Sequence, residues 1–136
     1  MSKEIPVAPP IRKIVYVEDE PDIQAIAQMA LEAIGGFEVV LCSSGREALE
    51  VIPQEMPDLV LMDVMMPELD GPSTLQALRE VEECKHLPVA FMTAKVQKSE
   101  IDEFISLGAI GVIPKPFDPM KLSDEVKRLW EKVHAG

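Results

Sequence analysis

Short apolar runs alternate with longer amphipathic stretches along most of this chain. Five of the runs have the length of buried β-strands and are bounded by turn-forming residues. They span residues 13–17, 37–41, 59–63, 89–92 and 109–113. Runs that are apolar throughout, rather than alternating, are typical of parallel sheets covered on both faces. The pattern therefore predicts a five-stranded parallel sheet.

The stretches between and after these runs carry apolar residues at helical spacing. The first predicted helix begins near Pro21 and ends at Gly35, and the other four span about 43–52, 72–84, 98–107 and 118–133. The positions expected to face inward are Ile23, Ile26, Ala27, Ala30, Leu31, Ile34, Leu75, Leu78, Val81, Ile101, Phe104, Ile105, Leu122, Val126, Leu129, Trp130 and Val133. Alternation of strands and helices predicts an α/β fold with helices on both faces of the sheet. Pro114 suits a strand at the sheet edge, since it donates no ladder hydrogen bond.

Polar side chains follow four of the predicted strands directly. Glu18 and Asp19 come after the first strand, Asp63 closes the third, Thr93 follows the fourth and Lys115 follows the fifth. Ligands of open parallel sheets bind outside the carboxyl ends of the strands. We therefore expect these five side chains to meet at one edge of the sheet.

This combination predicts a metal-assisted phosphoryl acceptor. A carboxylate such as Asp63 can attack phosphorus, provided that a divalent cation offsets the repulsion between the two anions. Mg²⁺ prefers oxygen ligands and typically takes one or two carboxylates, which Asp19 and the adjacent Glu18 can supply. Lys115 would stabilise charge on the phosphoryl oxygens, and Thr93 would donate a hydrogen bond to one of them. Each residue alone has an ordinary structural explanation, so the prediction depends on their joint arrangement.

Composition narrows the class of protein. The 136 residues fit one domain, and the net charge of -11 argues against a nucleic-acid partner. Cys42 and Cys84 have no CxxC spacing and are expected to be buried reduced thiols, while His86 and His134 are expected at the surface. The chain contains no apolar run of about 18 residues, so we expect a cytoplasmic protein without a membrane span. Residues 1–11 are rich in proline and are expected to form a flexible tail before a domain at 12–136.

From residue 12 to about 133, the chain resembles the receiver domain of two-component response regulators. The resemblance lies in four segments: Tyr-Val-Glu-Asp-Glu at 16–20, Asp-Val-Met-Met-Pro-Glu-Leu-Asp-Gly at 63–71, Met-Thr-Ala at 92–94 and Lys-Pro-Phe at 115–117. It implies the flavodoxin-like (βα)5 doubly wound fold with strand order 2-1-3-4-5. It also implies Mg²⁺ bound by Asp19, Asp63 and the main-chain carbonyl of Met65, with Glu18 acting through water. The peptide bond after Lys115 is expected to be cis.

The resemblance further implies how such a domain would signal. Asp63 would be phosphorylated by a histidine kinase or a histidine phosphotransfer protein, and the domain would not be an enzyme acting on other substrates. A downstream protein would contact the fourth helix, fifth strand and fifth helix. The protein would be a monomer or a weak phosphorylation-dependent dimer.

Three positions depart from the best-known pattern of the family. Val112 occupies a switch position that is often Tyr or Phe, so an inward-swinging aromatic ring is absent. We therefore expect phosphorylation to rearrange mainly residues 94–99 and the beginning of the fourth helix. Met65 and Lys95 occupy the two positions that flank the phosphoryl group, where small or polar groups can admit water. They bear on the lifetime of the phosphorylated state.

Three other functions are compatible with parts of the pattern. A flavodoxin would bind a cofactor phosphate with a loop rich in Ser, Thr and Gly after the first strand, where Glu18 and Asp19 would instead repel it. A phosphatase or dehalogenase with an aspartate nucleophile would need a second acid two residues after Asp63, and that residue is Met65. A scaffold that only keeps the fold would not need the acid pair, Asp63, Thr93 and Lys115 together. The active phosphoacceptor is the interpretation that uses all of them.

Overall fold

The computed structural model describes residues 10–135, so most of the tail predicted for residues 1–11 lies outside the described residues. Five parallel strands form one sheet in the order β2-β1-β3-β4-β5, which confirms the predicted topology. The strands are β1 (Lys13–Val17), β2 (Glu38–Cys42), β3 (Leu59–Asp63), β4 (Val89–Thr93) and β5 (Gly111–Pro114). β5 lies at the edge of the sheet, as Pro114 predicted.

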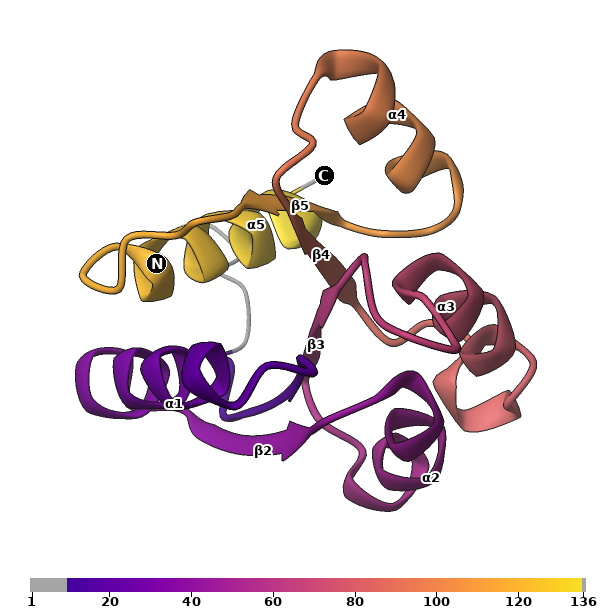
Figure 1. Ribbon diagram of the computed structural model, residues 1–136, viewed down its shortest axis with the longest axis horizontal. Helices are drawn as coiled ribbons and strands as arrows, with labels where there is room; N and C mark the ends of the chain where they lie inside the picture. The colour runs from indigo at the N-terminus through magenta and orange to yellow at the C-terminus, as the bar shows by residue number, and fades with distance from the viewer. Residues whose placement is uncertain (1–9, 136) are drawn as a thin grey trace, which may run out of the picture.

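Helices cover both faces of this sheet. They are α1 (Pro21–Met29), α2 (Gly45–Glu55), α3 (Gly71–Arg79), α4 (Lys98–Ser106) and α5 (Leu122–Ala135), with a π-helical turn η1 (Ala30–Ile34) after α1 and a 3-10 turn η2 (Glu82–Cys84) after α3. Figure 1 shows α1 and α5 on one side of the sheet and α2, α3 and α4 on the other. The molecule therefore has three layers, as the alternation of apolar runs predicted.

Two apolar clusters fill the spaces between these layers. Ile14 and Tyr16 of β1 point into the cluster beneath α1 and α5, whereas Val15 and Val17 point into the cluster beneath α2 and α3. All four side chains are fully buried. Because successive side chains of a strand point to opposite faces, a strand that serves both clusters must be apolar at every position.

The structure corrects three predicted helix boundaries. The third helix ends at Arg79 rather than near residue 84, because the Arg79 guanidinium donates to the carbonyls of Cys84 and Leu87 (2.9 and 2.7 Å) and holds a separate turn there. α2 continues past residue 52 to Glu55. The last hydrogen bond at this end of the helix runs from Met56 N–H to the carbonyl of residue 52. α5 begins at Leu122 rather than at residue 118, since residues 118–121 form a turn.

Four apolar residues that were expected to face inward are instead substantially exposed. They are Ile26, Ile34, Ile105 and Val133, with exposures of 43–47%. Ile26 and Ile105 lie at the margins of the apolar stripes of α1 and α4. Ile34 and Val133 lie in the last turn of their helical segments, where less of the core covers them. The two cysteines are buried and both histidines are exposed, as predicted. Among the helices of residues 10–135, none has both the length and the apolar character needed to cross a membrane.

Candidate functional site

The predicted site residues meet at the carboxyl edge of the sheet. Strand register places Val17 beside Met62, and Thr93 beside Pro114, so that the ends of β1, β3, β4 and β5 are level with one another. Glu18, Asp63 and Thr93 are almost completely buried there, with exposures of 0%, 6% and 4%. Burial of this degree is unusual for carboxylates unless they are paired or bind a metal.

Three carboxylates form a compact acidic cluster at this edge. Glu18, Asp19 and Asp63 each offer an oxygen, and these oxygens all lie within 4.8 Å of one another. Two of the acids belong to the loop after β1 and the third is the last residue of β3. Carboxylate oxygens alone, in a cluster of this size, suit Mg²⁺ better than a softer metal. The main-chain carbonyl of Met65 stays a predicted further ligand.

Lys115 provides the positive charge of the cluster. Its Nζ lies 3.0 Å from Oε1 of Glu18 and 3.2 Å from Oδ2 of Asp63, so that one ammonium group bridges two acids. Burial alone would lower the pKa of Lys115, but the hydrogen bond to Glu18 and the charge of Asp63 raise it overall. Lys115 is therefore a cation at neutral pH. Its peptide bond to Pro116 is cis, as the resemblance implied.

Glu18 has hydrogen bonds to both carboxylate oxygens. Oε1 accepts from Lys115 Nζ and from the hydroxyl of Tyr16 at 3.4 Å, and Oε2 accepts from the main-chain N–H of Glu20 at 3.2 Å. Burial raises the pKa of Glu18, and Lys115 acts against this shift. Burial, together with the charges of Glu18 and Asp63, raises the pKa of Tyr16 far above its ordinary value. The Tyr16 hydroxyl is consequently a permanent hydrogen-bond donor.

Tyr16 was not predicted as a site residue. A hydroxyl in an otherwise apolar strand, two residues before Glu18 and on the same side of that strand, is the signal that could have identified it. Its contact with Glu18 depends on the rotamers of both side chains, which the sequence pattern does not give.

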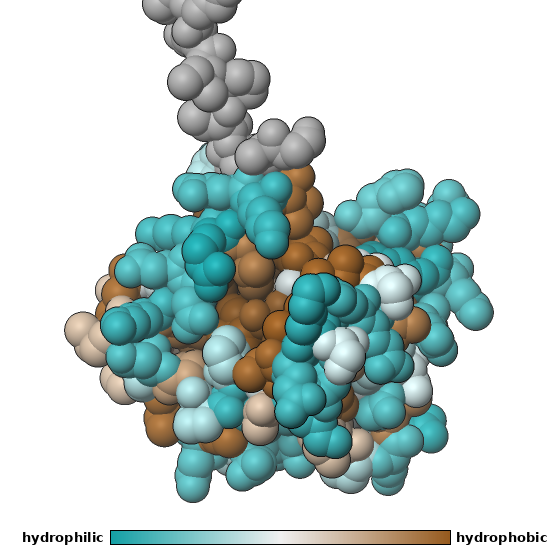
Figure 2. Space-filling model, turned by 90° about the horizontal axis from the view of Figure 1, so that it is seen from above, coloured by the Kyte–Doolittle hydropathy of each residue, from teal (hydrophilic) through white to brown (hydrophobic). Residues whose placement is uncertain are grey.

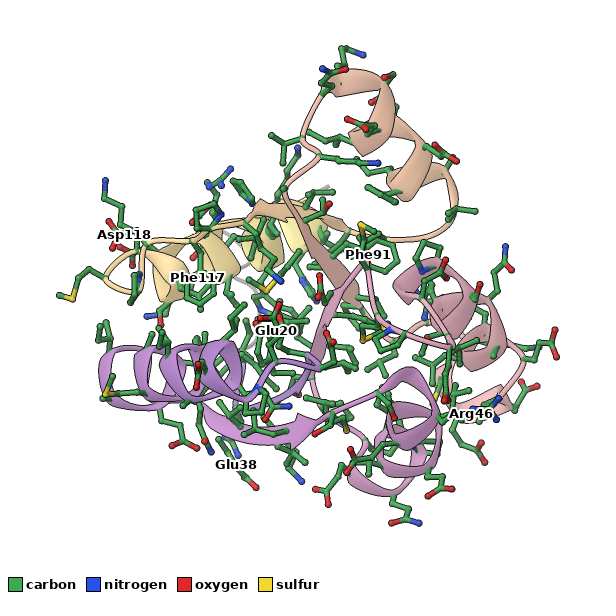
Figure 3. The ribbon with its side chains drawn as sticks, in the orientation of Figure 1. Glu20, Glu38, Arg46, Phe91, Phe117 and Asp118 are labelled. Carbon is green, nitrogen blue, oxygen red and sulfur yellow. The ribbon has the colours of Figure 1, made fainter. Side chains whose placement is uncertain are left out.

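A cavity of about 230 Å³ opens beside Asp63. Its lining residues are Glu20, Asp63, Met65, Thr93, Ala94, Lys95 and Lys115. The Thr93 hydroxyl oxygen accepts a hydrogen bond from Lys95 N–H at 3.1 Å, which leaves its own hydrogen free to be donated into the cavity. Met65 is 70% exposed and stands at the rim. Figure 3 shows Glu20 at the beginning of α1 and Phe117 between α1 and α5, on the two loops that flank this edge.

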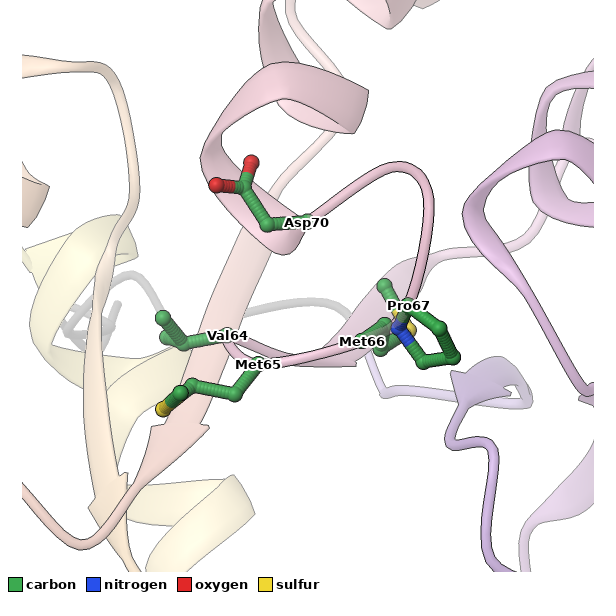
Figure 4. A pocket seen from close by; sticks show the side chains of 5 residues that line it. All are labelled: Val64, Met65, Met66, Pro67 and Asp70. Atoms are coloured by element: carbon green, nitrogen blue, oxygen red, sulfur yellow. The ribbon is translucent and has the colours of Figure 1, made fainter.

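The β3–α3 loop is folded closely against Asp63. A Cβ atom on Gly71 would lie 2.6 Å from the carbonyl oxygen of Asp63, so only glycine permits this approach. The side chain of Asp70 caps α3 by accepting from Ser73 N–H at 2.8 Å. Figure 4 shows the outer side of the loop, where Met65 and Asp70 line a shallow cavity of about 490 Å³. The Asp-Gly pair thus fixes the loop that follows the candidate phosphoacceptor.

Comparisons with known proteins agree with this geometry. The family described as "Response regulator receiver domain" matches residues 14–127. The chain belongs to the response regulator receiver family. Response regulator Rre1 of Synechocystis sp. is 36% identical over 130 residues, which cover 96% of this chain and 56% of that protein. The transcriptional regulatory protein PhoP of Bacillus subtilis, which is named for alkaline phosphatase synthesis, is 36% identical over 89% of this chain and 48% of its own length.

This receiver chain therefore spans about half the length of these curated relatives. Among solved structures, the chemotaxis response regulator CheY4 of Vibrio cholerae has a TM-score of 0.81 at 28% identity, covering 88% of this chain and 99% of that one. A response regulator from Chloroflexus aurantiacus has a TM-score of 0.79 at 29% identity, covering 89% and 98%. The relatives are signalling proteins rather than flavodoxins or phosphatases, and the receiver fold is shared along almost the whole of both structures.

Proposed function

We propose that Asp63 accepts a phosphoryl group from a histidine kinase or a histidine phosphotransfer protein in a Mg²⁺-dependent reaction. The observation that carries this proposal is the grouping of Asp63, Thr93 and Lys115 around one cavity, beside the acid cluster. A carboxylate that serves only the fold would not need an open cavity, a free hydroxyl donor and a half-buried ammonium group around it.

The roles of the side chains follow from their positions. A carboxylate oxygen of Asp63 attacks phosphorus, and the bond between phosphorus and the donor's imidazole nitrogen breaks. The Lys115 ammonium, 3.2 Å from Asp63 Oδ2, is placed to follow the negative charge as it moves onto the phosphoryl oxygens. The Thr93 hydroxyl is placed to donate to one of these oxygens. Neither Lys115 nor Thr93 has to cross the cavity to do so.

Charge explains why a divalent cation belongs to this reaction. The three carboxylates carry -3 and Lys115 carries +1, which leaves a local charge of -2. Bound Mg²⁺ would neutralise this charge and lower the repulsion between Asp63 and an incoming phosphoryl anion. Glu18, Asp19 and Asp63 are the residues that would hold it, directly or through water.

We further propose that the phosphorylated state is transmitted through α4, β5 and α5. Three features support this. α4 has no buried residue, so its attachment to the core is weak. Residues 94–97, which connect Thr93 to α4, are all exposed, and so are the first two residues of that helix. Figure 2, which views the molecule from the side of α4 and β5, shows apolar surface exposed between hydrophilic side chains. Polar contacts for a partner are available from exposed Lys98, Glu103, Lys121, Asp124 and Arg128.

The remaining parts of the proposal concern the whole protein. Residues 12–136 would act as the receiver domain, preceded by a tail at 1–11. The partners would be a kinase or phosphotransfer protein upstream and another protein downstream, with neither nucleic acid nor membrane bound by this domain. It would work in the cytoplasm as a monomer or a weak phosphorylation-dependent dimer.

Intact-mass measurement after incubation with a small phosphodonor tests the central step. With Mg²⁺ the protein should gain one phosphoryl group, and with EDTA it should gain none. Asp63→Asn should abolish the gain, whereas Asp70→Asn serves as the matched control, because asparagine also caps a helix. A Mg²⁺-dependent phosphate on the Asp63→Asn protein would show that the acceptor is another residue.

A further inference from the structure

The hydroxyl of Tyr16 is the least expected polar group in the core. Tyr16 lies on β1, an interior strand of the sheet, is fully buried, and belongs to the apolar cluster beneath α1 and α5. Its hydroxyl donates to Oε1 of Glu18 at 3.4 Å. Phenylalanine would fill the same space without a polar group to satisfy, so packing accounts for the ring and leaves the hydroxyl to be explained.

The second side chain that donates to Oε1 of Glu18 is Lys115, which also takes part in the proposed reaction. Lys115 donates to the same oxygen, Oε1, at 3.0 Å, and also lies 3.2 Å from Asp63. In the proposed reaction Lys115 must follow the charge onto the phosphoryl group. When it does so, Glu18 loses its ion pair while it remains fully buried. A buried carboxylate without a donor on one oxygen is unfavourable and free to rotate.

We propose that Tyr16 is a positioning residue of the metal site: its hydroxyl keeps the Glu18 carboxylate in its metal-binding orientation when Lys115 turns to the phosphoryl group. This inference rests on the proposed function. Tyr16 touches neither phosphoryl group nor metal, and acts only through Glu18. The Glu20 N–H, which donates to Oε2 at 3.2 Å, fixes the other end of the same carboxylate. Together these two donors set its plane without any help from Lys115.

The test compares Mg²⁺ binding by the full chain and its Tyr16→Phe variant, with calorimetric titration in the absence and presence of beryllofluoride. Without the phosphoryl mimic, Lys115 still holds Glu18, and the variant should bind Mg²⁺ no more than about twofold more weakly. With the mimic, the loss should grow to about tenfold, the lower end of the effect of other groups that orient a metal ligand. The half-saturating Mg²⁺ concentration for phosphorylation by a small donor should rise by a similar factor.

Ser123→Ala is the matched control. Ser123 also has a buried hydroxyl, and it lies beside the same apolar cluster as Tyr16. This hydroxyl donates to the carbonyl of Ala30 at 3.3 Å. Ala30 belongs to η1, which supplies no residue to the acidic cluster. Ser123→Ala should lower the melting temperature of the metal-free protein but leave Mg²⁺ affinity unchanged with and without the mimic. A purely structural Tyr16 would behave in the same way as Ser123.

Two results would separate the inference from the function on which it rests. If the wild type binds Mg²⁺ and takes a phosphoryl group, and Tyr16→Phe equals it with beryllofluoride present, the positioning role is overturned and the proposed function stands. If the wild type does neither, the proposed function fails and the inference fails with it.

Discussion

Replacing Lys115 by methionine should destabilise the metal-free protein and, at the same time, strengthen its stabilisation by Mg²⁺. Lys115 is the cation that bridges Glu18 and Asp63, whose exposures are 0% and 6%. Methionine keeps much of the length and apolar character of the lysine stem but leaves both carboxylates without their counter-ion. Bound Mg²⁺ then replaces the positive charge that the mutation removes, so Mg²⁺ stabilises the variant more than it stabilises the wild type.

The size of both effects can be worked from the geometry. Removing one partner of a buried ion pair costs about 3–5 kcal/mol, and we take about 2–3 kcal/mol here because water reaches the lysine head at the cavity. For a domain of this length that corresponds to a fall in melting temperature of roughly 6–15 °C. The local charge becomes -3 instead of -2 when the +1 of Lys115 is removed. One extra charge near the cation, screened by solvent, should add about 1 kcal/mol, or about fivefold, to Mg²⁺ affinity.

Thermal unfolding followed by circular dichroism, in EDTA and at several Mg²⁺ concentrations, measures both quantities. The control is Lys13→Met, which removes a more exposed ion pair (Lys13 Nζ to Glu55 Oε1, 2.9 Å) at the opposite end of β1. It should leave the Mg²⁺-dependent increment equal to that of the wild type. An increment in Lys115→Met that is no larger than in the wild type, with stability in EDTA unchanged, would refute the bridging role of Lys115.

Two further predictions concern α4 and its attachments. Adding beryllofluoride with Mg²⁺ should change hydrogen exchange chiefly at residues 94–99 and the beginning of α4, measured by mass spectrometry; changes confined to α1 or α2 would indicate another output face. Arg79→Met removes hydrogen bonds to the carbonyls of Cys84, Leu87 and Gly108 (2.9, 2.7 and 3.2 Å), and should lower the free energy of unfolding in urea by about 2–3 kcal/mol. An Arg79→Met protein as stable as the wild type would show that water replaces these bonds without loss.

The sequence was sufficient for the sheet and for the position of the site, because both depend on local features. Apolar runs with no alternation identify buried parallel strands, and the residue that ends each run necessarily lies at the carboxyl edge. Asp63, Thr93 and Lys115 could therefore be placed together before their distances were known. The same reasoning placed Glu18 and Asp19 at this edge, but it did not predict that Glu18 would be more deeply buried than Asp19.

What could not be predicted depends on contacts between distant parts of the chain. Glu18 and Lys115, which are 97 residues apart, form an ion pair whose geometry is decided by the packing of two loops. α3 ends early because Arg79 reaches carbonyls that follow it in sequence and one near the end of α4. The turn at Ala30–Ile34 is π-helical, and the carbonyl of Ala30 accepts a hydrogen bond from Ser123 of α5. The apolar periodicity of the first helix indicates neither feature.

The absence of an aromatic switch residue changes which groups can carry the proposed signal. Val112 is half-buried on β5 and has one stiff torsion, so it can fill little space if Thr93 moves. The main chain offers a more direct connection, since Lys115 N–H donates to the carbonyl of Thr93 at 2.9 Å. The two residues proposed to contact the phosphoryl group are thus hydrogen-bonded to each other where β4 and β5 end. Any shift that draws both toward Asp63 must also displace the loop to α4 and the edge strand. Because α4 has no buried residue, it can follow that displacement.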